Sequence, residues 1–260
     1  MILAFKVIVT PFFIVAVTPA GRNWGPNVSG LLMGLPLTSA PISAFLFIQY
    51  NTAYAARSAS GNLAGQASVC VFCLVYSLSA RKLTRLPATS LALALFLLST
   101  FIWNQFNLSI PAAIAVLGVV ICLVLWVMPD DALMVAPSSP PRWDLPARMV
   151  LQAAFVFALT AFATSLGPHL SGLIAPFPVF GTINAAFTHH QQGAETVARL
   201  LRGVVFGSLA YGTFFLIARS LIIRFPAGWT SLPASLGALG VSAGIFFAPG
   251  PLNKKCGSSR

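Results

Sequence analysis

The 260-residue chain is too apolar to fold as a soluble domain. Hydrophobic residues make up 57% of it and charged residues only 7%, whereas a soluble domain carries about 25% charged residues. The net charge of +11 would suggest nucleic-acid binding in a soluble protein, but lysine and arginine also flank membrane spans and set their orientation. The composition therefore predicts an all-α polytopic membrane protein, with the lipid bilayer as its partner and no nucleic acid.

The four longest uncharged stretches hold six of the predicted membrane spans. They cover residues 23–56, 86–129, 149–194 and 225–253, and a single span needs about 20 residues. We predict nine transmembrane helices, at about 3–20, 27–50, 59–80, 86–103, 108–128, 148–166, 170–189, 203–223 and 229–249. Residues 1–20 also have the features of a signal peptide, with Lys6 before the apolar run. Their retention as a span or removal by cleavage is left open, although the repeat described below favours retention.

Basic residues are distributed unevenly between the two sides of this arrangement. Eleven fall on the side of the C-terminal tail, and four fall on the other side, at Lys6, Arg57, Arg219 and Arg224. The richer side of a membrane protein faces the cytoplasm. The sequence thus predicts a multi-pass protein of the bacterial inner membrane with its N-terminus outside and its C-terminus in the cytoplasm.

An internal repeat at an offset of 142 residues is the most informative feature of the sequence. The segment GPNVSGLLMGLP from Gly25 matches GPHLSGLIAPFP from Gly167, and 15 of the 53 pairs that begin at Gly25 are identical. The matches include the Arg-x3-Gly-x3-Gly pattern that starts at Arg57 and again at Arg199. Identical glycine, proline, glutamine and arginine residues at one fixed offset indicate a duplication.

The duplication predicts a definite domain organisation. Residues 1–103 form one four-helix repeat, residues 104–128 form a connector helix, and residues 148–250 form the second repeat. A hydrophilic linker at 129–147 holds three of the four acidic residues, and residues 251–260 form a cytoplasmic tail. Four helices followed by one extra crossing make the second repeat start from the opposite side of the membrane. The two repeats are then inverted in topology, as in many secondary transporters.

Each repeat carries a proline deep in its second predicted helix, Pro36 in one and Pro178 in the other. Proline removes a backbone donor and breaks the helix, and discontinuous helices in matching halves indicate a binding site at the membrane midplane. An ordinary pair of kinks is the alternative. The predicted ligand-binding residues lie at or after these breaks: Pro36, Thr38, Ser39, Gln49, Phe177, Pro178, Asn184 and Gln191. Each polar one is alternatively a hydrogen-bonding contact between helices.

Three charged residues are candidates for gating or charge coupling. Arg57 and Arg199 begin the third helix of each repeat, where they serve either as gates or as flanking groups that reach the lipid headgroups. Glu195 is the only acidic residue near a span outside the linker, which suits a carboxylate that carries a proton. No metal site, cofactor or catalytic constellation is expected, and the chain is not predicted to be an enzyme.

The segment SGLIAPFP from Ser171, followed by Gly193 and the Arg199-x3-Gly203 pattern, resembles the GlpM family of small bacterial inner-membrane proteins. The resemblance covers about residues 148–249, and the first half departs from it because Gly34-Leu-Pro36 replaces Pro176-Phe-Pro178. It implies that this chain is a fused double version of a unit that elsewhere pairs with itself. A homo-oligomer of the whole chain stays open.

Two functions fit these features. The first is a transporter or permease for a small polar or anionic solute, with its site between the second and seventh predicted helices. The second is a non-transporting membrane scaffold that assists envelope or exopolysaccharide assembly, in which the prolines and glycines serve helix packing alone.

Overall fold

The computed structural model describes residues 25–35, 52–106, 108–128, 143–155, 157–158, 177–222 and 227–247, with side chains except at 52–59, 219, 222 and 227–232. No strand occurs within these ranges. The helices are α2 (Pro26–Met33), α4 (Thr52–Ser79), α5 (Arg85–Gln105), α6 (Ile110–Val127), α8 (Val179–Ile222) and α9 (Ala227–Phe247). Residues 144–155 are helical as well. The first predicted span, 3–20, lies outside the described residues.

Four of these helices are long and apolar enough to cross a membrane: residues 60–79 of α4, all of α5, all of α6 and residues 179–218 of α8. They are the helices of a membrane-embedded protein. The prediction of an all-α membrane fold is confirmed at this level.

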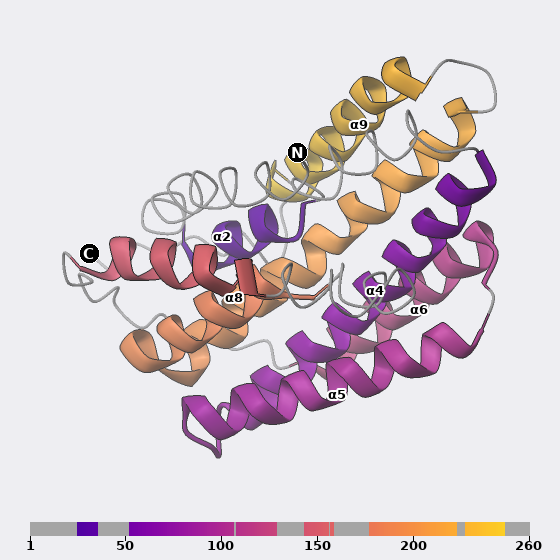
Figure 1. Cartoon of the computed structure of the whole chain (residues 1–260). Coiled ribbons are helices and arrows are strands. Elements are labelled where there is room, and N and C mark those ends of the chain that lie inside the picture. The colour runs from indigo at the N-terminus through magenta and orange to yellow at the C-terminus, as the bar shows by residue number, and fades with distance from the viewer. Residues whose placement is uncertain are drawn as a thin grey trace.

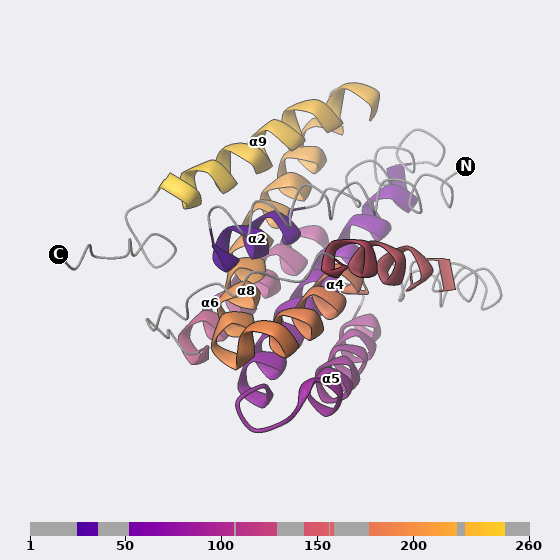
Figure 2. The same ribbon diagram turned by 90° about the vertical axis from the view of Figure 1, so that its left-hand side faces the viewer.

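Helices α4 and α8 form the centre of the molecule (Figure 1). Helix α4 packs against α5, α6 and α8, while α8 also packs against α2 and α9. Large buried side chains fill the space between them, including Phe72 and Tyr76 of α4, Phe96 of α5 and Phe214 of α8. Figure 2 shows α9 crossing over one end of α8 on the side away from α5.

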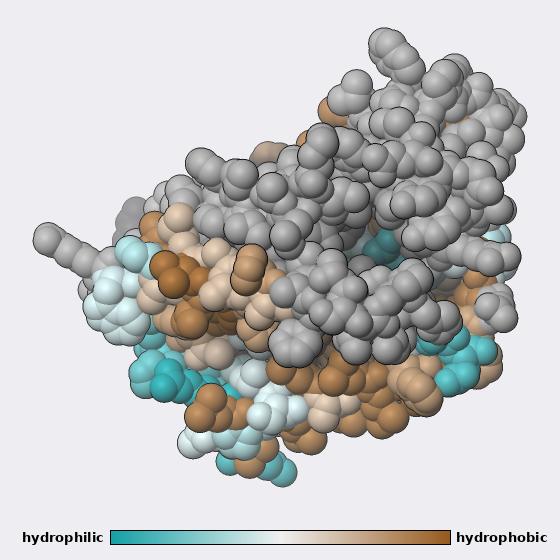
Figure 3. Space-filling view, viewed as in Figure 1, coloured by the Kyte–Doolittle hydropathy of each residue, from teal (hydrophilic) through white to brown (hydrophobic). Residues whose placement is uncertain are grey.

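Helix α5 presents an apolar surface that matches the hydrocarbon core of a bilayer. Leu97, Leu98 and Phe101 are each more than half exposed, and Figure 3 shows a hydrophobic band here with hydrophilic patches at both ends. The exposed Arg85 and Gln105 are the end residues of this helix. Apolar side chains exposed between two polar ends are typical of a surface that faces lipid.

The observed bounds of α8 differ from the helix boundaries predicted for the second half of the chain. The sequence predicted helices at 170–189 and 203–223 with a loop between them, but residues 179–222 are helical apart from one break at Gly193, where φ is +84° and ψ is 178°. Only glycine adopts this backbone conformation readily. The polar residues from His189 to Arg202 suggested a loop, yet they continue the helix and bend it at Gly193.

Of the two prolines related by the 142-residue offset, the described one, Pro178, lies at the start of a helix rather than deep in one. Helix α8 begins at Val179, directly after Pro178, and α2 ends at Met33, three residues before Pro36. The prediction of Pro178 in the interior of a helix is therefore wrong, because the helix starts after it. Pro36 itself lies outside the described residues, so its position stays a prediction.

Glycines allow α2 to lie against the backbone of α8. A Cβ atom added at Gly30 would overlap the carbonyl oxygen of Leu200, and one added at Gly203 would overlap the carbonyl oxygen of Asn27. Gly34 and Gly207 meet in the same way one turn further on. This is the close approach that small residues spaced four apart permit in membranes.

Helix boundaries repeat at the offset found in the sequence. Shifted by 142 residues, α5 (Arg85–Gln105) coincides with α9 (Ala227–Phe247). The same shift carries α4 (Thr52–Ser79) onto the part of α8 that follows Gly193. Helix α5 packs on α4, and α9 packs on α8, so equivalent helices also have equivalent neighbours.

We expect Gly203→Ala to destabilise the protein by about 1–3 kcal/mol, since the new Cβ overlaps backbone that cannot move independently. The matched control is Gly61→Ala, at the counterpart of Gly203 in the repeat, where a Cβ meets nothing within 4 Å. Alanine favours helix over glycine by about 1 kcal/mol, so this variant should be neutral or slightly stabilised. Thermal unfolding in detergent micelles measures both, and equal melting temperatures for the two variants would contradict the packing of α2 on α8.

Candidate functional site: a buried polar network

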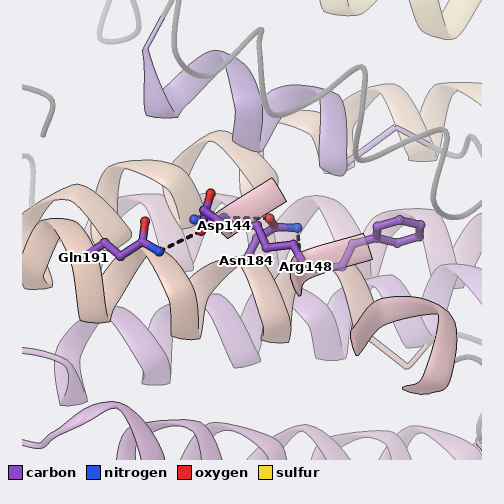
Figure 4. A network of polar contacts seen from close by, with 5 residues as sticks. Asp144, Arg148, Asn184 and Gln191 are labelled. Atoms are coloured by element: carbon purple, nitrogen blue, oxygen red, sulfur yellow. Dashed lines mark hydrogen bonds and ion pairs between the residues drawn. The ribbon is translucent and has the colours of Figure 1, made fainter. Parts of the chain in front are cut away.

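The helix at 144–155 and the first part of α8 meet through polar side chains. Asp144 and Arg148 come from the first helix, and Asn184 and Gln191 come from α8 (Figure 4). Asp144, Arg148 and Asn184 are each less than a tenth exposed. This combination of charge and burial makes the network the strongest candidate site in the described part of the chain.

An ion pair forms the centre of the network. The Nε of Arg148 donates to Oδ1 of Asp144 at 2.9 Å, one helical turn apart in the same helix. The amide of Gln191 donates to the same oxygen at 2.7 Å. One carboxylate oxygen thus accepts from a cation and from an amide, which is the arrangement that binds carboxylates strongly.

The guanidinium of Arg148 also joins the two helices directly. Its Nη1 donates to Oδ1 of Asn184 at 2.9 Å, and its Cζ lies 5.1 Å from the centre of the Phe187 ring. The Asn184 amide in turn donates to the backbone oxygen of Phe180 at 3.0 Å. The planar cation is therefore held by hydrogen bonds and by the face of an aromatic ring.

Gln152 lies one turn after Arg148 on the same helix and is fully buried. Neither its amide nitrogen nor its amide oxygen has a hydrogen-bond partner within the structure. Buried polar groups are nearly always paired, and an unpaired one costs about 1–3 kcal/mol. Within the described part of the chain, the Gln152 amide therefore has unused hydrogen-bonding capacity.

The contacts between the two helices fix their register. Asp144 meets Gln191, Arg148 meets Asn184, and Phe155 meets Phe177 at 5.5 Å between ring centroids. The two segments therefore run antiparallel, and Gln152 lies at the level between Asn184 and Phe177. That level is the first turn of α8, where the helix dipole presents partial positive charge.

The structure brings four of the predicted ligand-binding residues into or beside this network. Asn184 and Gln191 are members of it. Phe177 packs against Phe155 and, at 5.5 Å between centroids, against Phe96 of α5, while the carbonyl of Pro178 accepts from Thr182. The four from the first repeat lie outside the described residues: Pro36, Thr38, Ser39 and Gln49.

Two of the predicted charged candidates, Glu195 and Arg199, lie in the part of α8 that follows Gly193. Glu195 is in the first turn after Gly193, where a carboxylate interacts favourably with the helix dipole. Arg199 follows one turn later and does not begin the helix as predicted, because the helix continues through it. The side chain of Arg57 is not among those described.

The prediction from the sequence placed Asp144 wrongly and did not include Arg148 and Gln152 among the site residues. Asp144 was assigned to a solvated linker at 129–147, but it is 1% exposed and lies in the first turn of a helix. The spacing of Asp144, Arg148 and Gln152 at four and eight residues was the available signal, since such residues share one helix face. The prolines before and after Asp144 obscured it, although proline is tolerated in a first helical turn.

A second polar cluster joins α4 to α8 at their crossing. Gln66 donates to Oγ of Ser208 at 2.9 Å, and the thiol of Cys70 lies 3.4 Å from the same oxygen. Ser208 donates to the backbone oxygen of Val204. These groups are buried and satisfy one another, so they serve contact between the helices.

Neither metal ligation nor kinship identifies the site. Among the described residues, no three histidine, cysteine or acidic side chains lie close enough together to hold a metal ion. Comparisons with family models, curated proteins and solved structures find no match to the chain. The geometry of the polar network therefore carries the functional argument.

We expect Arg148→Met to lower the free energy of unfolding by about 3–5 kcal/mol, because it leaves the Asp144 carboxylate buried without its cation. The double variant Asp144→Leu/Arg148→Met should recover most of that loss, since it removes both charges together. Lys82→Met, at an exposed position, is the control and should change stability by less than about 0.5 kcal/mol. Losses that simply add in the double variant would show that the two side chains do not interact.

Proposed function

We propose that the protein is a transporter or permease for a small polar or anionic solute, with its site at the polar network beside the start of α8. The observation that carries this proposal is a charged, buried network next to a helix that begins in the interior of a predicted span. Backbone breaks and charges at membrane depth are tolerated where they line a solute pathway or are enclosed by protein. The partial positive charge at the start of α8 favours an anion.

An inverted-repeat architecture supports this function. The coincidence of the helix boundaries at the 142-residue offset agrees with a duplicated unit. Helix α4 and the second part of α8 run in opposite directions (Figures 1 and 2), as equivalent helices must if the second unit is inverted. We propose two four-helix repeats joined by α6, nine spans in total, with kinship to the GlpM family.

The contact between Gln66 and Ser208 supports a pseudo-two-fold axis between the repeats. The two residues are counterparts, because they lie 142 positions apart. In a two-fold interface, a residue near the axis contacts its own counterpart. The axis of an inverted repeat lies in the membrane plane, which agrees with the crossing of α4 and α8 at this pair.

Three contacts support the predicted grouping of these segments on one side of the membrane. Tyr76 near the end of α4 approaches His189, Asp144 meets Gln191, and Arg202 donates to the backbone oxygen of Met128. All three contacts join residues at or near the ends of predicted spans, on the side that the basic-residue distribution assigns to the cytoplasm. We propose an inner-membrane protein with its N-terminus outside and its C-terminus in the cytoplasm.

Purified protein in liposomes tests the transport function. We expect flux of at least one small anion, and we expect Pro36→Ala and Pro178→Ala to lower it about tenfold or more by restoring continuous helix at the breaks. Pro233→Ala changes an exposed proline within α9 and should leave flux unaltered. A scaffold role becomes the better account if no solute crosses and both breaks can be removed without effect in cells.

Labelling of the native Cys256 tests the orientation. In a variant in which Cys70, Cys73 and Cys122 are replaced by alanine, a membrane-impermeant maleimide should react with Cys256 only after the cells are opened. Cysteine introduced at the exposed Lys82 should behave in the same way. Reaction of either position in intact cells would contradict the proposed topology.

A further inference from the structure

The Asp144 carboxylate is bound within the polar network in the way that the carboxylate of a solute could be bound. Oδ1 of Asp144 accepts from the guanidinium of Arg148 at 2.9 Å and from the amide of Gln191 at 2.7 Å. The two donors come from different helices and converge on one oxygen. A carboxylate from another molecule that occupied this position would meet the same two donors.

The Gln152 amide, next to the ion pair, has hydrogen-bonding groups that are not used. Gln152 follows Arg148 by one helical turn, a rise of about 5.4 Å, and its buried amide has neither a donor nor an acceptor as partner in the described structure. An amide can donate two hydrogen bonds and accept at its oxygen. A hydroxyl group satisfies both functions because it donates and accepts.

We propose that Arg148 and Gln152 bind a small hydroxycarboxylate, the carboxylate at the guanidinium and the hydroxyl at the amide, with Asp144 occupying Arg148 when the solute is absent. This assignment of a solute class rests on the transport function proposed above. The spacing of one helical turn suits a solute of three or four heavy atoms in length. The positive end of the α8 dipole at the same level favours the anionic form.

Competition between Asp144 and the solute has a measurable consequence. The apparent affinity of a ligand falls in proportion to the fraction of molecules whose site is available. Replacing Asp144 with asparagine removes the internal charge and keeps an amide that fits the same space. The site should then be available in a larger fraction of molecules.

The test is thermal unfolding of the purified full-length chain with three solutes of nearly equal size. Lactate carries both groups, propionate lacks the hydroxyl, and lactamide lacks the charge. We expect lactate to raise the melting temperature most and lactamide least. Asp144→Asn should tighten lactate binding about tenfold, as expected if the internal carboxylate occupies Arg148 in about nine molecules of ten.

Two variants with matched controls assign the groups. Gln152→Leu should remove the preference for lactate over propionate, while Gln105→Leu at an exposed position should retain it. Arg148→Gln should abolish the response to both acids, while Arg85→Gln, also exposed, should not. Because binding to the unaltered protein is measured first, poor folding of any variant does not remove the test.

The proposal is overturned if none of the three solutes stabilises either the unaltered protein or Asp144→Asn, or if lactamide stabilises as well as lactate. Lactate that binds and does not cross liposomes would refute transport but leave the site intact. Flux of other solutes without lactate binding would refute the site but leave transport intact.

Discussion

The absence of water from a bilayer interior governs this molecule, because each buried polar group must find its partner within the protein. The network around Arg148 meets this requirement with a carboxylate, an amide and an aromatic face. Serine hydroxyls meet it locally, as where Ser208 donates to the backbone of its own helix. Gln152 meets it least well among the described residues of the network, since it is fully buried and both its amide nitrogen and its amide oxygen are without a partner.

The same constraint explains the two ways in which α8 is packed. Lipid gives helices no hydrophobic reason to associate, so close contact depends on shape and on hydrogen bonds. Where α2 crosses α8, glycines bring the two backbones together. Where α4 crosses α8, Gln66 and Ser208 provide a hydrogen bond at the centre, and large aromatic side chains fill the space around it. Small residues and polar contacts thus position the helix whose start borders the candidate site.

The sequence predicted the apolar helices well and the polar segments around Asp144 and at 190–202 poorly. The boundaries of α5, α6 and α9 were within two residues of those predicted, because each is an apolar run bounded by polar residues or by proline. The loop predicted at 190–202 was wrong, since charge in a membrane protein marks either a loop or a helix with partners elsewhere in the fold. Asn184 and Gln191 were predicted from their place after a proline, but Asp144 was not, because its burial depends on a helix distant in sequence.

The two segments related by the 142-residue offset differ in their polar residues. At the 142-residue offset, Asp144 corresponds to Ile2 and Asn184 to Ile42, whereas Phe187 and Gln191 have identical counterparts. Arg148 corresponds to the basic Lys6, so the proposed duplication makes the basic, aromatic and amide positions older than Asp144 and Asn184. A site built by one copy alone is asymmetric, and the hydrogen bonds Arg148–Asn184 and Gln191–Asp144 join the helix at 144–155 to the first part of α8. In the proposed inverted repeat such a site would lie nearer one face of the membrane, so the proposed solute would face paths of unequal length to the two sides.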